Sequence, residues 1–430
     1  MFRRVSGWLL VAGFVAGNSA AAAAPGFYGL GDLPGGGYSS AANDVSDDGL
    51  VVVGESIGAS GTSGFRWTAA AGIQPLPLAT ATATNADGSV VAGKNLRWTA
   101  ATGALPMQGV FDLDFGAHAA AMSSSGNVVV GTWDLVHSFR WVSGAGAATA
   151  VGDFSLAADV TGDGAAVLGL GTLGPGIWRA GQPVQLLGSL PSELVNYPVS
   201  LADNGSVAVG IYLDFLGQLK SYRWTQADGM VPLPHLVPGS PQLLAADISG
   251  DGTRIVGVDA GGTRQDAFLW TPSYGTLDLQ NWLVANGFAI PAGWSLSTAT
   301  AISANGLTIV GEGVNPQGQT EGWAVRLPGP GDATRDGIVD GADYTAWADH
   351  FLTTTNLFAH GDFNWDGLVD GADYTVWADH FAPFAASPFA AGTIAVVPEP
   401  GAGWLLASGG ALLVLARRMR AGRRGANAER

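Results

Sequence analysis

Short runs of alternating hydrophobic and polar positions extend from residue 40 to residue 327, and one pattern returns about every 40 residues. A strand of small residues is followed by a polar turn with glycine and by a valine-rich strand that ends in glycine. A third strand carries tryptophan, often as Phe-Arg-Trp, and a weaker strand rich in Leu and Pro closes the unit. The first two strands of the units lie in residues 43–54, 85–93, 122–131, 158–169, 201–210, 246–257 and 301–311.

Asp-Gly and Asn-Gly pairs stand in most of these turns, for example Asp87-Gly88 and Asn305-Gly306. Both residues of such a pair accept positive φ, so the pairs predict tight hairpins. Four strands in about 40 residues are typical of a β-propeller blade. We therefore expect a mainly β protein, with many short strands and turns.

The first and last repeat units are incomplete in a complementary way. The last unit ends at Leu327 without a fourth strand, and an unassigned strand stands near the N-terminus, at residues 27–34. Pairing the two would complete a blade and leave no open sheet edge. The pattern thus predicts a seven-bladed β-propeller over residues 25–328. An open β-solenoid is the alternative, and it would not need the split unit.

Two nearly identical segments follow the repeats, at residues 331–351 and 361–381. Oxygen-bearing side chains fall at positions 1, 3, 5, 9 and 12 of a 12-residue loop, with glycine at position 6 and a backbone carbonyl ligand expected at position 7. This spacing predicts two Ca2+ ions as cofactors. The predicted ligands are Asp332, Thr334, Asp336, Ile338, Asp340 and Asp343, and Asp362, Asn364, Asp366, Leu368, Asp370 and Asp373. A solvated acidic linker is the alternative, but it would not keep the acids at fixed spacing.

A helix is predicted after each loop, with aromatic residues at three- and four-residue spacing, as in Tyr344, Trp347 and Phe351. Pro328-Gly329-Pro330 block a helix before the first loop. In these features, and in Asp at position 12, residues 331–381 resemble a type I dockerin. The resemblance implies a small α-helical module and a cohesin-like protein partner. Positions 10 and 11, which read the partner in dockerins, are Gly-Ala in both loops and offer little hydrogen bonding.

Both ends of the chain have the pattern of targeting signals. Residues 1–24 combine Arg3 and Arg4, an apolar stretch and small residues, which predicts a secretory signal peptide. Near the C-terminus, after a linker at residues 382–396, a Val-Pro-Glu-Pro motif precedes an apolar stretch, residues 401–416, and an arginine cluster. The predicted sorting residues are Val397, Pro398, Glu399, Pro400, Arg417, Arg418 and Arg420.

This C-terminal arrangement, residues 397–424, resembles the PEP-CTERM sorting signal of bacteria that make extracellular polysaccharide. The resemblance implies a transmembrane helix that anchors the protein transiently in the inner membrane. It also implies an exosortase-type membrane protease as a partner, and release to the cell envelope or extracellular matrix. A plain membrane anchor is the alternative.

The repeats resemble the HAF-repeat family of bacterial extracellular proteins. The resemblance rests on the Gly-Asp-Leu-Pro-Gly-Gly start (residues 31–36), the Ala-x-x-Val-Ser-x-Asp-Gly turn (residues 42–49) and the Phe-Arg-Trp strand. It implies no known reaction. The chain of 430 residues has a net charge of −16, which argues against a nucleic-acid partner. It has no cysteine, so disulfides and thiol chemistry are excluded.

The sequence contains no convincing catalytic motif, although carboxylates recur in the repeats. Asp44, Asp159, Asp203 and Asp247 stand at nearly equivalent positions, where a pair could serve a glycosidase or each could stabilise its turn. The Arg-Trp pairs could stack on sugars, but they more often mark blade packing, with the arginine satisfying loop carbonyls.

Taken together, the motifs favour an exported, non-catalytic cell-surface or extracellular-matrix protein. The propeller would be an interaction platform for extracellular polysaccharide or protein, and the calcium module an assembly element. The alternative is a secreted carbohydrate-active enzyme of the glycoside hydrolase class that carries a dockerin, which a cluster of channel carboxylates would favour. A third hypothesis is that calcium only stabilises the C-terminal stalk.

Overall fold

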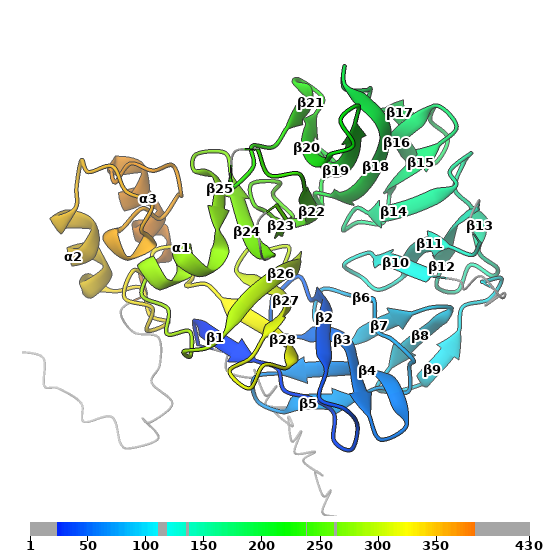
Figure 1. Ribbon diagram of the computed structural model, residues 1–430, viewed down its shortest axis with the longest axis horizontal. Coiled ribbons are helices and arrows are strands. Elements are labelled where there is room, and N and C mark those ends of the chain that lie inside the picture. The colour runs from blue at the N-terminus through cyan, green and yellow to red at the C-terminus, as the bar shows by residue number, and fades with distance from the viewer. Residues whose placement is uncertain (1–23, 111–117, 135–136, 238, 262–264, 383–430) are drawn as a thin grey trace, which may run out of the picture. The chain divides into compact units, whose positions relative to one another are not determined.

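A computed structural model describes residues 24–382, except 111–117, 135–136, 238 and 262–264. These residues all fall in the first of two compact units, Met1–Pro383. Seven four-stranded antiparallel sheets are arranged as blades around a common axis (Figure 1). The predicted seven-bladed β-propeller is therefore confirmed, and the open solenoid is excluded.

The predicted signal peptide, the linker and the sorting signal lie outside the described residues. None of the helices in the described part is long and apolar enough to span a membrane.

The strands follow the repeat units in chain order. Blades 1 to 3 consist of β2 (Ser40–Val45), β3 (Val52–Gly58), β4 (Gly61–Thr68) and β5 (Gly72–Pro75); β6 (Ala83–Thr84), β7 (Val90–Gly93), β8 (Leu96–Thr99) and β9 (Gly103–Pro106); and β10 (His118–Met122), β11 (Val128–Thr132), β12 (Ser138–Val142) and β13 (Thr149–Ala150). Blades 4 and 5 consist of β14 (Leu156–Val160), β15 (Ala166–Gly171), β16 (Gly174–Arg179) and β17 (Gln185–Leu186); and β18 (Glu193–Leu201), β19 (Val207–Asp214), β20 (Leu219–Thr225) and β21 (Gly229–Pro232). Blades 6 and 7 consist of β22 (Leu243–Ile248), β23 (Ile255–Asp259), β24 (Asp266–Thr271) and β25 (Gly275–Asp278); and β26 (Ser295–Ile302), β27 (Thr308–Val314), β28 (Thr320–Arg326) and β1 (Gly26–Gly29).

The seventh blade is closed by the N-terminal strand, as the split unit predicted. β1 pairs antiparallel with β28, with Gly26 opposite Arg326 and Gly29 opposite Trp323. The strand covers only part of the predicted residues 27–34. Because the first and last segments of the propeller share one sheet, the ring has no free edge at the point where it closes.

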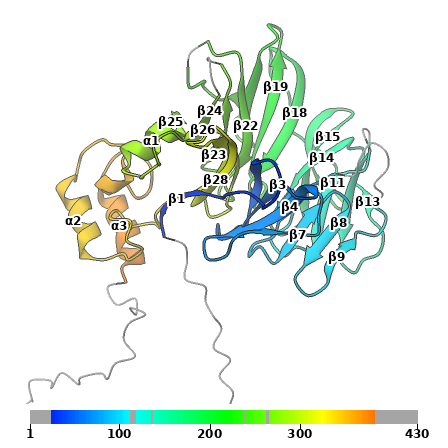
Figure 2. The same ribbon diagram turned by 60° about the horizontal axis from the view of Figure 1, so that its bottom comes forward.

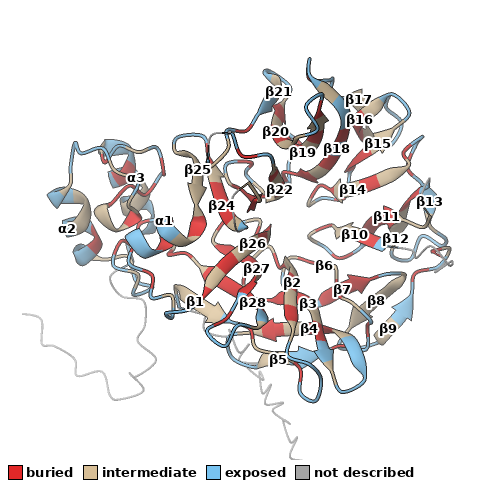
Figure 3. Ribbon diagram, viewed as in Figure 1, coloured by how far each residue is buried: buried red, intermediate tan, exposed pale blue. Residues whose placement is uncertain are grey.

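The hydrophobic core lies between the blades rather than within one of them. Seven buried clusters each join two neighbouring blades, and the cluster of blades 6 and 7 also includes buried residues of 279–288 and of 358–365. Buried positions follow the inner strands, and exposed positions gather on the outer strands and turn tips (Figure 3). Each blade therefore needs its neighbours to bury its apolar faces.

The glycine that ends the valine-rich strand is required by this packing. Gly54 lies opposite Phe65, which is fully buried. A Cβ on Gly54 would lie 2.0 Å from the Ala41 carbonyl oxygen and 2.8 Å from the Phe65 ring. Gly257 has the same relation to Phe268, at 2.8 Å. The repeated glycine thus makes room for the aromatic residue of the Phe-Arg-Trp strand.

The arginine of that strand links blades 1, 2 and 3 to the blade that follows each of them. The guanidinium groups of Arg66, Arg97 and Arg140 donate to the carbonyl oxygens of turn glycines in the following blade, at 3.0, 3.1 and 3.0 Å. These bonds confirm the interpretation that the arginines satisfy loop carbonyls.

The prediction of tight two-residue hairpin turns needs a correction. In Asp87-Gly88 only the glycine has positive φ, at 67°. Asn85 and Val90 close a longer loop, with the Asn85 N–H bonded to the Val90 carbonyl.

Three α-helices and one short 3-10 helix are present in the described residues: α1 (Leu279–Ala285), α2 (Gly341–Asp349), α3 (Gly371–His380) and η1 (Phe358–His360). The helix α1 was not predicted and connects blades 6 and 7. The helices after the two predicted calcium loops are as predicted. Asp340 and Asp370 begin them with capping boxes, in which Asp343 and Asp373 take the reciprocal role.

Candidate functional site

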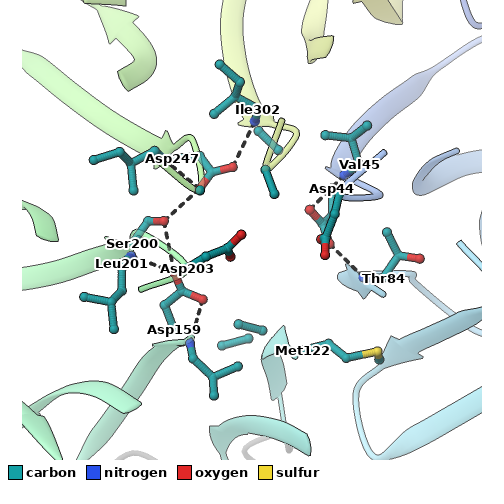
Figure 4. Close-up of a pocket in the computed structure, with 18 of the residues that line it drawn as sticks. Asp44, Val45, Thr84, Met122, Asp159, Ser200, Leu201, Asp203, Asp247 and Ile302 are labelled. Carbon is teal, nitrogen blue, oxygen red and sulfur yellow. Dashed lines mark hydrogen bonds between the residues drawn. The ribbon is translucent and has the colours of Figure 1, made fainter. Parts of the chain in front are cut away.

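Three aspartates on inner strands project into the central channel of the propeller (Figure 4). Asp44, Asp159 and Asp247 lie near the ends of β2, β14 and β22, in blades 1, 4 and 6. The channel cavity measures about 180 Å³, and none of the described residues that line it is Lys, Arg or His. Protein atoms surround the three carboxylates, although part of each faces the cavity.

Each of these carboxylates joins two blades through backbone hydrogen bonds. It accepts one bond from the N–H of the next residue and one from the equivalent N–H of the following blade. The pairs of donors are Val45 and Thr84 for Asp44 (2.8 and 2.7 Å), Val160 and Leu201 for Asp159 (2.7 and 2.7 Å), and Ile248 and Ile302 for Asp247 (2.8 and 2.9 Å). The aspartates thus fasten blades 1 to 2, 4 to 5 and 6 to 7. They hold neighbouring blades together rather than their own turns, which bond instead to Asp48, Asp163 and Asp251.

Ser200 occupies the equivalent position of blade 5, between two of the aspartates. Its Oγ lies 3.0 Å from Asp159 Oδ2 and 2.7 Å from Asp247 Oδ1. A hydroxyl has one hydrogen to donate, so both contacts are hydrogen bonds only when one carboxyl group is protonated. Sequence analysis missed this residue. Aligning Ser200-Leu201 with Asp159-Val160 would have identified it.

The pKa values agree with a shared proton. Burial, and then the charge of Asp247, raises the pKa of Asp159 to about 7. Burial raises the pKa of Asp247 to about 6. The pKa of Asp44 is raised well above its usual range, by burial first and then by the charge of Asp247. Neutral carboxyl groups near pH 7 are therefore expected in the channel.

Asp203 is not equivalent to Asp44, Asp159 and Asp247, although the repeat pattern predicted that it would be. It lies three residues beyond Ser200, in the place that Asp47 has in blade 1. Both side chains line the channel, and burial is the main cause of their raised pKa. At this level, backbone bonds run from blade to blade, such as Ala86 N–H to Ser124 O (3.0 Å). The structure thus places five carboxylates on the channel wall, on two levels.

The channel is small for a sugar substrate. Sites for organic ligands measure about 300–1,000 Å³, and this cavity of about 180 Å³ is smaller. Glycosidases place a proton-donating carboxyl group and a carboxylate on opposite sides of a bound sugar. The raised pKa of Asp159 fits such a donor, and the cavity is below the usual size of such a site.

The predicted calcium loops turn their first and last acidic residues inward. Asp332, Asp343, Asp362 and Asp373 are buried, with at most 2 % of each residue exposed. Both position-6 glycines have positive φ, 83° and 88°, as the sharp turn requires. Burial, and then nearby carboxylates, raises the pKa of Asp362 to about 7.

The donor set of the loops has features that fit a hard cation. Asp332 Oδ1 is buried without a hydrogen-bond partner among the described residues. Carboxylate and carbonyl oxygens at the predicted ligand positions are the groups that Ca2+ prefers. Other ligand positions bond to the backbone of the loop: Asp336 and Asp366 accept from the N–H groups of Ile338 and Leu368, and Asp340 and Asp370 cap the helices. Within the described residues, no three acidic or histidine side chains converge as metal ligands. The calcium assignment therefore stays a prediction.

No family model matches this chain, and no curated protein does. Solved structures are similar at the level of the fold. They include the putative TolB from Agrobacterium tumefaciens (12% identity, 48% of this chain, 88% of that one, TM-score 0.33) and TolB from Acinetobacter baumannii (12%, 65%, 64%, TM-score 0.37). An oligogalacturonate lyase from Vibrio parahaemolyticus has 10% identity over 70% of this chain and 93% of its own, with a TM-score of 0.47. At this identity the likeness concerns the fold alone.

Proposed function

We propose that this protein is an exported, non-catalytic cell-surface or extracellular-matrix protein whose propeller is an interaction platform. The observation that carries the proposal is an apolar rim on blades 4 and 5. We define the apolar rim as Leu173, Leu194, Tyr197, Phe215 and Leu216, whose exposed fractions are 79, 55, 48, 64 and 81%. Exposed apolar patches on soluble proteins mark interaction sites.

The apolar rim has a defined position on the fold. Its main part is one end of the hairpin of β18 and β19, the long strands of blade 5 (Figure 2). The Phe215 N–H donates to the Ser192 carbonyl at 3.1 Å, so the turn at 215–216 lies beside the segment that contains Leu194. An anchored turn with two large apolar side chains in water suits a partner that covers them, such as an extracellular polysaccharide.

The non-catalytic part of the proposal rests on the channel. Asp44, Asp159 and Asp247 each accept two backbone hydrogen bonds between blades, which accounts for their presence without a reaction. The alternative, a secreted carbohydrate-active hydrolase, is favoured by one observation. The channel holds a carboxyl group with a pKa of about 7 close to a second carboxylate, as acid–base catalysis requires.

The remaining parts of the proposal come from the sequence motifs. The two loops bind Ca2+ and make residues 331–381 a calcium-dependent assembly module. An exosortase-type protease recognises the C-terminal sorting signal, and the protein passes to the cell envelope or matrix after a transient anchor in the inner membrane.

Binding and release can be measured in one experiment. The full-length protein is incubated with a panel of extracellular polysaccharides, with Ca2+ or with a chelator, and retention and released sugars are scored together. We expect retention without release, lost in the double variant Phe215→Ser/Leu216→Ser and kept in Asp159→Asn. Release that disappears in Asp159→Asn would overturn the proposal and establish the hydrolase. Retention that is unchanged in the rim variant would show that the rim is not the binding surface.

A further inference from the structure

The two predicted calcium loops contact the propeller through equivalent residues. Arg335 and Trp365 occupy position 4 of the first and second loop, and both have positive φ, 64° and 63°. Arg335 donates to the Asn286 carbonyl at 2.8 Å and lies over the Phe288 ring at 5.4 Å. The Trp365 ring lies 5.1 Å from the ring of Trp282 on α1. The residues that precede the glycine turn of each loop thus attach the segment to α1 and the residues after it.

Hydrogen bonds between the propeller and the residues that connect the two loops strengthen this attachment. Asn286, which is 3% exposed, accepts the Phe358 N–H on its Oδ1 at 2.8 Å. The indole N–H of Trp282 donates to the Asn356 carbonyl at 3.1 Å. Trp365 is 9% exposed, although a tryptophan at this loop position would be exposed without a neighbour. Packing and hydrogen bonds therefore hold the segment in one position on the propeller.

The second loop has an additional contact at its predicted metal ligands. Tyr274, in the turn between β24 and β25 of blade 6, donates its hydroxyl hydrogen bond to Asp362 Oδ2, the predicted ligand at position 1. Its ring also packs on the loop, since a Cβ on Gly367 would lie 3.3 Å from Tyr274 Cε1. The guanidinium carbon of Arg254 lies 4.2 Å from the centre of the Trp365 ring. In the first loop, by contrast, Asp332 Oδ1 has no partner among the described residues.

We propose that Tyr274 is the propeller's contribution to the second calcium site, so that Ca2+ binding at this loop and attachment of the segment to blade 6 stabilise each other. This inference rests on the calcium binding proposed above. A donor that fixes a metal-ligating carboxylate in its binding orientation raises metal affinity, and its loss costs about 10-fold to 100-fold. Because coupling between two binding events is reciprocal, the ion must also strengthen the attachment.

Calorimetric titration of the full-length protein with Ca2+ tests the first half of the proposal. We expect two bound ions, and in Tyr274→Phe a roughly 10-fold or greater loss of affinity at one site with the other unchanged. Tyr212→Phe is the control, because it removes a hydroxyl from a tyrosine of β19 in blade 5, whereas the loops contact blade 6 and the residues that follow it. Far-UV circular dichroism establishes that each variant is folded.

Hydrogen exchange measured by mass spectrometry tests the second half. In the unmodified protein, Ca2+ should slow exchange in residues 279–288 of the propeller, and in Tyr274→Phe this protection should require about 10-fold more Ca2+. Two bound ions with unchanged affinity in Tyr274→Phe, or no Ca2+-dependent protection of residues 279–288, would overturn the coupling and leave calcium binding intact. A protein that binds no Ca2+ would overturn the calcium function itself.

Discussion

The propeller should become less stable as the pH rises from 5 to 8, because of the buried aspartates of the channel. Asp159 has its pKa raised from 3.8 to about 7, by burial first and by Asp247 second. Between about pH 3.8 and pH 7 the folded state keeps a proton on Asp159 that the unfolded state has lost. Unfolding then releases a proton, and the free energy of unfolding falls as the pH rises. The contribution is complete below about pH 4 and is lost as the pH passes about 7.

The size of the effect follows from the same pKa. A change from 3.8 to about 7 corresponds to about 4 kcal/mol, at about 1.36 kcal/mol for each tenfold change in proton binding. This value is an upper limit, since the carboxylate faces the channel cavity, where solvent reduces the cost of a charge. The contribution of Asp247 is not added to it, because the two groups share Ser200 and titrate as a pair.

The assay is urea unfolding of the full-length protein at pH 5, 6, 7 and 8, in chelator so that Ca2+ does not contribute. Other groups titrate in this range, including His235 and His360, whose lowered pKa works in the opposite direction. The difference between the unmodified protein and Asp159→Asn therefore isolates the channel. We expect the free energy of unfolding of Asp159→Asn to fall less between pH 5 and pH 8 than that of the unmodified protein. Parallel pH profiles for the two proteins would refute the shared-proton argument.

Two further substitutions test the packing and the calcium loops. Gly54→Ala should destabilise the propeller by about 3 kcal/mol or prevent folding, because the new Cβ would lie 2.0 Å from a carbonyl oxygen and 2.8 Å from Phe65; Gly37→Ala, with nothing within 4 Å, should be close to neutral in the same urea assay. Asp366→Asn with Asp370→Asn should lower the melting temperature in Ca2+ but not in chelator. If this variant still binds the partner of the unmodified protein, calcium only stabilises the segment; if partner binding is lost at unchanged stability, calcium serves assembly.

The sequence predicted the propeller because blade periodicity is a local property. Each unit encodes its own strands, turn and buried aromatic residue, so the number of blades and the missing strand at Leu327 are visible without a structure. The pairing of β1 with β28 followed because a free sheet edge is unfavourable. The predicted calcium loops were visible for the same reason, since a 12-residue loop carries its own oxygen ligands at fixed spacing.

The channel and the attachment of the calcium segment depended on contacts between distant residues. Ser200 carries no motif, and it matters because the packing of blades 4, 5 and 6 places it between Asp159 and Asp247. Tyr274 reaches Asp362 across 88 positions of the chain. By itself the sequence determined the blade strands and the two helices after the loops, since they depend on near neighbours, whereas it did not reveal α1. Only the tertiary structure decided which carboxylates are buried, which share a hydroxyl and which propeller residues meet the loops, because burial and electrostatics depend on side chains that only the complete fold brings together.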